Sequence, residues 1–218
     1  MILEKIKQNM PLALNIIPST LQLPVMEQFY TIQGEGFYQG QAAYFIRLAG
    51  CDVGCVWCDV KESWDVGKHL IYKIEDLLSN IKRTPAGIVV ITGGEPLMHD
   101  LTELTAQLKK EGLRTHIETS GSSLLSGSWD WITLSPKKFK APLPEVIPYA
   151  NELKVIIFNN SDFAWAEKYA AKVSATCKLY LQPEWSKAAI VTPFIIDYIK
   201  AHPQWQLSLQ IHKYINVP

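Results

Sequence analysis

Three of the chain's four cysteines, Cys51, Cys55 and Cys58, lie close together with the spacing C-x3-C-x2-C. Thiolates at this spacing can surround one inorganic cluster. Three sulfurs on a four-iron cluster leave one iron without a protein ligand, and that iron can bind a substrate or cofactor directly. The spacing therefore predicts a reactive iron–sulfur cluster, because a cluster that only transfers electrons is usually closed by four ligands.

Two other interpretations of the cysteines are open at this point. With a distant histidine such as His69, the three thiolates could hold structural zinc, since Cys3His sites are common. In a secreted chain they could form disulfides, although Cys55 and Cys58 lie too close in sequence for an ordinary structural bridge. The fourth cysteine, Cys177, lies alone at the edge of an apolar run, which predicts a buried or half-buried structural thiol.

Length and composition favour one globular domain. The chain has 218 residues, of which 48% are hydrophobic and 19% charged, as in ordinary folded domains. Lys plus Arg and Asp plus Glu both number 21, and no basic run could neutralise a series of phosphates, so we expect no nucleic-acid partner. No apolar run approaches the roughly 20 residues that cross a bilayer. The start of the chain resembles a signal peptide poorly, so we expect the reducing cytoplasm, which suits an oxygen-sensitive cluster.

The cysteine loop lies in a chain whose apolar segments alternate between strand and helix patterns. Residues 1–24 contain three prolines and no sustained period, so we expect an N-terminal extension there and one core domain over residues 25–218. Strands are predicted over residues 25–32, 43–48, 87–91, 114–118, 131–134, 152–158, 179–182 and 206–211. Helices are predicted over residues 73–83, 101–111, 163–170 and 193–201. The alternation implies an α/β fold with a mainly parallel sheet, which we expect to form a partial, open TIM-like barrel because the units are too few for a closed one.

Short polar segments follow several of these strands and are expected to meet on one face of the sheet. They are residues 33–36, 92–96, 118–120, 135–137 and 182–185. Each alone is also typical of a plain turn. Arg47 interrupts an apolar strand, so it either pairs with an internal carboxylate or faces an anionic ligand.

Together with the cysteines, and in this order, these segments resemble the radical S-adenosylmethionine (SAM) superfamily. Within it they resemble the 7-carboxy-7-deazaguanine synthases, the ring-contracting enzymes of queuosine and 7-deazapurine biosynthesis, from about residue 26 to the C-terminus. The marks of that family are the segments FYTIQGEG (29–36), FIR (45–47), TGGEP (92–96), SPK (135–137), NELK (151–154) and HPQW (202–205), with HKYINVP (212–218) at the end. Other radical SAM enzymes share the cysteines and the Gly-Gly-Glu, but not this beginning together with this ending.

The resemblance implies two ligand sites beside a 4Fe-4S cluster on Cys51, Cys55 and Cys58. The SAM site would comprise Trp57, Cys58, Asp59, Gly94, Ser135, Pro136, Lys137, Gln182, Pro183, Glu184 and Trp185. The pocket for 6-carboxy-5,6,7,8-tetrahydropterin would comprise Ile32, Gln33, Gly34, Glu35, Arg47, Thr92, His212 and Pro218. Arg47 suits the substrate carboxylate, and the guanidine-like edge of the pterin needs acceptors such as Glu35 or a terminal carboxylate. The backbone around Gly94 and the Glu95 carboxylate suit the methionine amino group.

The histidines have plainer interpretations as well. A single histidine such as His212 is as often a satisfied structural residue as a ligand-binding one. The others are expected to be structural or exposed, namely His69, His99, His116 and His202.

The sequence departs from the family pattern at one position. Family members often carry threonine or serine directly after the Cys-Asp pair, where the hydroxyl binds a magnesium ion that also touches the substrate carboxylate. Val60 occupies that position here. Valine offers no oxygen, so magnesium must be held by water, backbone or Asp59, or be dispensable.

The resemblance implies a reaction in which the reduced cluster gives an electron to SAM and the resulting 5′-deoxyadenosyl radical takes a hydrogen from C6 of the pterin. Ring contraction and loss of ammonia follow, and SAM is regenerated. An external reductant of the flavodoxin or ferredoxin type and a homodimer are also implied. Two alternatives are an activating enzyme that places a glycyl radical on a partner protein, and a non-catalytic, zinc-stapled binding module.

Overall fold

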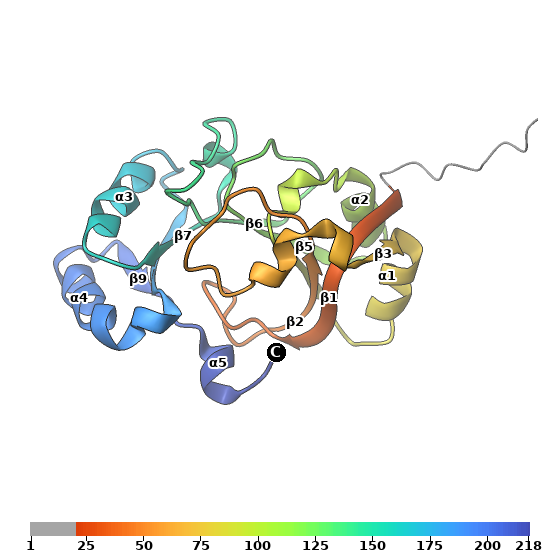
Figure 1. The fold of residues 1–218 in the computed structure, drawn as a ribbon, viewed down its shortest axis with the longest axis horizontal. Coiled ribbons are helices and arrows are strands. Elements are labelled where there is room, and N and C mark those ends of the chain that lie inside the picture. The colour runs from red at the N-terminus through yellow and green to blue at the C-terminus, as the bar shows by residue number, and fades with distance from the viewer. Residues whose placement is uncertain (1–20) are drawn as a thin grey trace, which may run out of the picture.

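The computed structural model describes residues 21–218. A single nine-stranded sheet curves through the molecule, with helices on its outer side (Figure 1). Its strands are β1 Gln22–Ile32, β2 Ala42–Leu48, β3 Leu70–Lys73, β4 Ile88–Gly93, β5 Arg114–Thr119, β6 Trp131–Leu134, β7 Glu152–Ile157, β8 Lys178–Pro183 and β9 Trp205–Leu207. The helices are α1 Ile74–Ile81, α2 Thr102–Lys110, α3 Ser161–Ala170, α4 Ala188–Ala201 and α5 Ile211–Ile215.

The strand order is β3-β1-β2-β4-β5-β6-β7-β8-β9, and the sheet does not close into a barrel. β1 pairs antiparallel with both β2 and β3. Every pair from β2–β4 to β8–β9 is parallel. Helical crossovers connect most of the parallel strands, as parallel pairing requires. The predicted fold, an α/β protein with an open and mainly parallel sheet, is confirmed.

Two apolar clusters pack the helices against the sheet. One lies between the sheet and helices α1 and α2 and includes Leu77, Ile91 and Leu104. The other lies beneath α3 and α4 and includes Ile195 and Trp205. These five side chains are at most 1% exposed, and burial of each contributes about 1.5–3 kcal/mol to the free energy of unfolding. The clusters fix the strands, and so the polar strand ends, in place.

The elements differ from the prediction mainly at the two ends of the sheet. β1 begins at Gln22, before the predicted residue 25, while residues 1–20 of the predicted extension lie outside the described residues. β3 was not predicted. The predicted strand over residues 206–211 exists only in part, because β9 spans Trp205–Leu207 and α5 begins at Ile211. Helix α4 begins at Ala188, five residues before the predicted Pro193.

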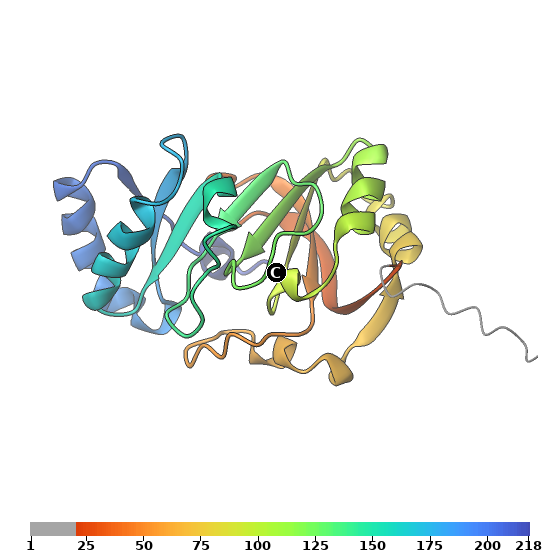
Figure 2. The same cartoon turned by 90° about the horizontal axis from the view of Figure 1, so that it is seen from above.

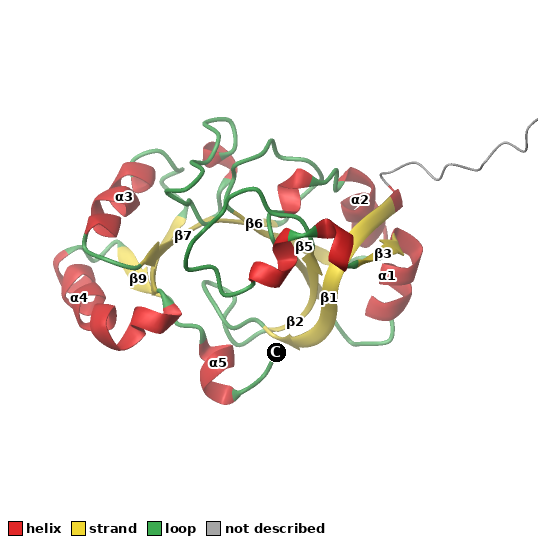
Figure 3. Cartoon of the chain, in the orientation of Figure 1, coloured by secondary structure: helices red, strands yellow, loops and turns green. Residues whose placement is uncertain are grey.

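The parallel strands bring their carboxyl ends to one edge of the sheet. The loop that follows β2 crosses this edge (Figure 2) and contains only short 3-10 turns (Figure 3). This loop carries Cys51, Cys55 and Cys58. The cysteine motif therefore faces the polar strand ends, as the sequence predicts. Among residues 21–218, no helix has the length and apolar character needed to cross a bilayer.

Candidate active site

A cavity opens at the carboxyl edge of the sheet. The volume of this cavity is about 390 Å³. Its lining combines the three clustered cysteines, seven of the eleven residues predicted to bind SAM and all eight predicted to bind the pterin. The fold thus brings together residues that are as far apart in sequence as Ile32 and Pro218.

Cys51, Cys55 and Cys58 all line this cavity and all are free thiols. Gly54 takes a positive φ of 72°, which lets the loop turn between the first two cysteines. Burial raises the pKa of Cys55 to about 11, against the opposing attraction of Lys137. The thiol is therefore expected to lose its proton only when a cationic metal centre takes the sulfur.

The donor set fits a cubane cluster better than a single ion. Among residues 21–218, no three His, Cys, Asp or Glu side chains are grouped closely enough to hold one metal ion. A cubane binds each thiolate through a different iron atom, so its cysteines stand farther apart than the ligands of one ion. The imidazole Nε2 of His69 instead lies 2.7 Å from the carbonyl oxygen of Glu62. The structure therefore gives the zinc interpretation no fourth ligand at His69.

The two glycines at the end of β4 hold the cysteine loop against the sheet. Gly93 has a φ of 134°, and a Cβ at this position would lie 2.1 Å from the carbonyl oxygen of Leu48. A Cβ at Gly94 would lie 2.2 Å from the carbonyl oxygen of Gly50. The Gly94 amide donates to Leu48 at 3.0 Å. Only glycine permits this close backbone packing, and Gly94 also lines the cavity.

Glu95 is buried, and its carboxylate is already satisfied by the protein. It accepts hydrogen bonds from the Leu97 amide at 3.1 Å, from the Ser120 amide at 2.8 Å, and from the hydroxyls of Thr119 and Ser120. These donors use both carboxylate oxygens. Glu95 therefore joins the ends of β4 and β5, and because it also lines the cavity, its contact with the methionine amino group stays a prediction.

Seven of the predicted SAM residues line the cavity, namely Trp57, Cys58, Asp59, Gly94, Ser135, Lys137 and Gln182. The other four, Pro136, Pro183, Glu184 and Trp185, are not part of its lining. Glu184 accepts hydrogen bonds from the amides of the turn that follows it, at 3.1 Å. The Trp185 ring is 41% exposed and packs edge-on against Tyr214 at 5.3 Å between centroids. These four residues lie next to the cavity at the end of β6 and β8.

Two lysines stabilise the walls near the cysteines. The ammonium of Lys137 donates to the Ser135 carbonyl at 2.9 Å and also to the Ser135 hydroxyl. Burial lowers the pKa of Lys137. Lys213 donates to Asp59 at 2.7 Å. Burial favours the neutral form of Asp59, but Lys213 outweighs it and lowers the pKa of that carboxyl.

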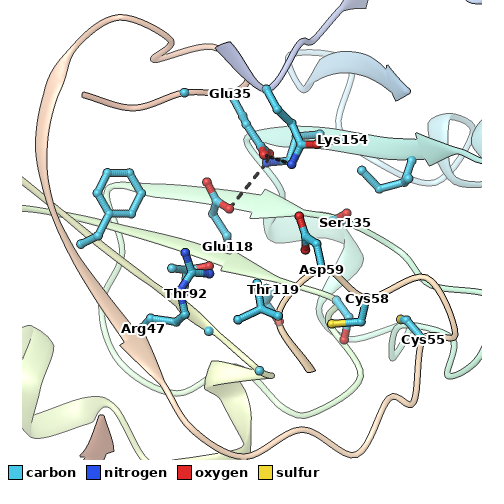
Figure 4. Close-up of a pocket in the computed structure, with 18 of the residues that line it drawn as sticks. Glu35, Arg47, Cys55, Cys58, Asp59, Thr92, Glu118, Thr119, Ser135 and Lys154 are labelled. Carbon is cyan, nitrogen blue, oxygen red and sulfur yellow. Dashed lines mark hydrogen bonds and ion pairs between the residues drawn. The ribbon is translucent and has the colours of Figure 1, made fainter. Parts of the chain in front are cut away.

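Arg47 pairs with a carboxylate and also lines the cavity, where it could meet an anionic ligand. Its Nε donates to Glu27 at 2.6 Å, and its side chain is 22% exposed. The guanidinium also lines the cavity, where it lies beside Thr92 (Figure 4). An arginine with one nitrogen engaged keeps further donors for an anionic ligand.

A buried charge network that the sequence did not reveal forms the opposite wall. Lys154, 4% exposed, pairs with Glu35 and lies 3.5 Å from Glu118 (Figure 4). Glu35 also accepts from Gln210 at 2.9 Å, and Glu118 accepts from Gln33 at the same distance. The signal was present in the sequence, because Lys154 interrupts an apolar strand just as Arg47 does.

The protonation states of this network follow from its contacts. Burial opposes ionisation of Glu35, but the attraction of Lys154 and the hydrogen bonds prevail and lower its pKa to about 2. Burial also disfavours the charged form of Lys154, yet Glu118, Glu35 and Glu152 raise its pKa. Burial raises the pKa of Glu152. The wall therefore presents ionised Glu35 and Lys154 to the cavity.

Helix α5 lies against the turn after β1 and lines the cavity. The Ile211 amide donates to the Gly34 carbonyl at 3.0 Å. A Cβ at Gly34 would lie 2.1 Å from Nδ1 of His212, so the two residues are in direct contact. Both His212 and Pro218 line the cavity, and burial lowers the pKa of His212.

Comparison with known proteins gives concordant matches. A family model described as the Radical SAM superfamily matches residues 45–139. The 7-carboxy-7-deazaguanine synthase of Flavobacterium psychrophilum is 56% identical over 196 residues, which cover 90% of this chain and 93% of that protein. The protein of the same name from Escherichia coli K12 is 36% identical and is covered completely. The crystal structure of QueE from Escherichia coli superposes with a TM-score of 0.78 at 35% identity, over 86% of this chain and 93% of that chain.

Proposed function

Because the chain belongs to the 7-carboxy-7-deazaguanine synthase family of radical SAM enzymes, we propose that its cavity contracts the ring of 6-carboxy-5,6,7,8-tetrahydropterin with loss of ammonia. The product is 7-carboxy-7-deazaguanine, in queuosine and 7-deazapurine biosynthesis. One observation on the cavity supports this assignment most directly. A single cavity combines the three free thiols with Arg47 on one wall and a carboxylate network on another.

Cys51, Cys55 and Cys58 would hold a 4Fe-4S cluster, and SAM would lie along Trp57, Asp59, Gly94, Ser135, Lys137 and Gln182. When bound, these groups supply the one-electron cleavage that generates a hydrogen-abstracting radical. Lys137 brings a cation close to the cysteines, which suits an anionic, thiolate-bound cluster and the SAM carboxylate. The reaction needs an external reductant, for which we propose a flavodoxin or ferredoxin. We also propose a homodimer, on the family likeness alone.

The remaining walls suit the two ends of a carboxypterin. Arg47 would bind the substrate carboxylate through the guanidinium nitrogens that Glu27 does not engage. Glu35 and Glu118 would accept hydrogen bonds from the guanidine-like edge, because Lys154 holds Glu35 ionised. Ile32, Gln33, Gly34, Thr92, His212 and Pro218 complete this part of the lining. In this proposal, opposite charges of the cavity wall meet opposite ends of the ligand.

The residues around Val60 do not fit a magnesium ion. Val60 lines the cavity without offering an oxygen, and the neighbouring Asp59 is paired with Lys213 at 2.7 Å. A protein-bound magnesium ion keeps several waters and is held by one or two carboxylates, and here Lys213 competes with the metal for Asp59. We therefore propose that this chain binds the substrate carboxylate through Arg47 and needs no magnesium for turnover.

The cavity also bears on the glycyl-radical alternative. An activating enzyme must admit a polypeptide loop to its cluster. Here α5 and the residues after it form part of the cavity lining through His212, Lys213 and Pro218. The volume of about 390 Å³ is that of a site for a small molecule. The small-molecule reaction is therefore the better-supported function.

The deciding experiment is a mass-spectrometric assay of anaerobically reconstituted protein with reductant, SAM and the pterin, with and without magnesium. We expect 7-carboxy-7-deazaguanine in both arms at similar rates. Product in the magnesium arm alone would contradict the magnesium proposal but support the reaction. Deoxyadenosine without product would mean that the radical chemistry is present but the substrate is wrong.

A further inference from the structure

A second, much smaller cavity lies behind the carboxylate wall. Gln33, Glu35 and Glu118 line both cavities. The small one is completed by Tyr38, Val90, His116, Trp131, Thr133 and Glu152. The volume of this small cavity is about 10 Å³. That is about the minimum volume for one buried water.

His116 lines this small cavity and carries an unpartnered polar atom. The residue is 3% exposed, and its Nε2 has no hydrogen-bond partner within residues 21–218. The ring is held in place by Tyr38 at 4.5 Å and Trp131 at 6.4 Å between centroids. Burial, with a smaller effect of Arg114, lowers the pKa of His116 to about 4. The imidazole is therefore neutral, and leaving its Nε2 dry would cost free energy.

The facing wall supplies the other partners that a buried water requires. Glu118 accepts one hydrogen bond from Gln33 at 2.9 Å and lies 3.5 Å from the Lys154 ammonium. Glu152 accepts from the Phe37 amide and from the Trp131 indole, both at 3.1 Å. A carboxylate has about four acceptor positions, so both retain free ones. Two to four polar partners are what a stable internal water needs.

We propose that the small cavity holds one internal water molecule, which hydrogen-bonds to His116 Nε2 and to the Glu118 carboxylate, and that His116 thereby positions Glu118. Gln33 and Lys154 hold Glu118 from two sides. The water is its third attachment, on the side away from the main cavity. The presence of the water is independent of any substrate, whereas its effect on pterin binding rests on the proposed function.

Three variants separate this role from simple packing. His116→Phe keeps an aromatic ring but removes the nitrogen, whereas His116→Gln keeps a polar side chain. Tyr38→Phe is the control, because the Tyr38 hydroxyl belongs to the same aromatic group but contacts Arg114 instead. We expect KM for the pterin to rise roughly tenfold in His116→Phe, as for a lost hydrogen bond to a charged group. The kcat and the SAM affinity of this variant should stay near those of the wild type.

In His116→Gln and Tyr38→Phe we expect KM within about twofold of the wild type, because neither change removes the bond to the water. A crystal structure of the wild-type protein, at a resolution that defines ordered waters, should show one water within hydrogen-bond distance of His116 Nε2. A dry cavity overturns the proposal even if His116→Phe does not fold. An unchanged KM in His116→Phe also overturns it. An equal rise of KM in His116→Gln and His116→Phe does so as well. If the wild type does not convert the pterin at all, the proposed function fails, and the crystal structure still decides on the water.

Discussion

At the scale of single residues, Arg47 is the group that we propose to bind the substrate carboxylate. We expect Arg47→Gln to raise KM for the pterin by roughly tenfold or more, since a charge-assisted hydrogen bond is lost. The affinity for SAM, measured by calorimetry, should not change. The matched control is Glu27→Gln. This change removes the charge of the Glu27 side chain, which is 43% exposed and pairs with Arg47, but it leaves the guanidinium in the cavity. Equal effects of the two changes would show that Arg47 acts only through its pairing with Glu27.

Lys154 is the charged residue of the cavity wall that we expect to matter most for the stability of the fold. Removing one partner of a buried ion pair leaves the other charge without compensation. We therefore expect Lys154→Met to lower the free energy of unfolding at neutral pH by about 3–5 kcal/mol. The double variant Lys154→Met with Glu35→Gln should recover part of this loss, which urea unfolding would measure. No recovery would mean that Glu35 is not the charge left uncompensated.

The same pair predicts a pH dependence. Glu35 has a lowered pKa of about 2 in the folded protein, so its stabilisation is present above the ordinary carboxyl pKa and is lost as pH falls toward 2. Lys154 has a raised pKa, so its contribution is present below the ordinary lysine pKa and is lost only at more alkaline pH. The difference in unfolding free energy between wild type and Lys154→Met should thus shrink between about pH 5 and pH 2. A difference that stays constant on acidification would contradict the ion pair.

For the cysteines the comparison is between Cys55 and Cys177. Cys55→Ala should abolish both the brown iron–sulfur absorbance and product formation after anaerobic reconstitution. Cys177, 8% exposed and outside the cavity lining, provides the control, and Cys177→Ala should keep the colour and the activity. An active Cys55→Ala variant would remove the cluster from the mechanism.

The cysteine loop could be predicted from the sequence because all its ligands lie in one short segment. Glu95 and Lys154 show why other residues could not. The partners of Glu95 are Thr119 and Ser120, which reach it only because β4 and β5 are neighbours. Lys154 meets Glu35 only because the turn after β1 reaches β7. Both assignments need strand order, which a local pattern does not contain.

At the scale of elements, the contact between α5 and the turn after β1 forms one side of the pocket. Gly34→Ala would place a methyl group on the imidazole of His212. We expect this change to displace α5, to raise KM for the pterin and to increase protease cleavage after residue 210. Gly87→Ala is the control, because a Cβ at Gly87 meets no atom within 4 Å. Unchanged kinetics in Gly34→Ala would show that α5 does not shape the pocket.

The end of the chain also shows how tertiary contacts override a local pattern. Residues 206–211 alternate between polar and apolar side chains, which is typical of a strand. In the structure, Ser208 accepts a hydrogen bond from the Gly36 amide and donates to Gln182. Gln210 donates to Glu35. The side chains of Ser208 and Gln210 thus bind partners inside the protein, and the backbone leaves the sheet after Leu207.

At the scale of the whole molecule, the open parallel sheet could be predicted because its strands and helices alternate with clear periods. We propose that residues 21–218 fold without residues 1–20. Deleting those 20 residues should leave product formation unchanged and shift the melting temperature by less than about 4 °C, or roughly 1 kcal/mol. A chain that begins at residue 27 is the control, since it lacks Leu23 and Val25, each 2% exposed. That control should be clearly destabilised, and a similar loss in the shorter deletion would contradict the proposed boundary.

The open sheet also has a consequence for behaviour at high concentration. Among the described residues, β3 and β9 are its two edge strands, and free edges are templates on which another chain can add a strand. β9 has only three residues. β3 carries Leu70 and Ile71, which are 70% and 55% exposed. Aggregation of the concentrated protein is therefore expected to start at β3, and a charged residue at position 70 would suppress it without touching the active site.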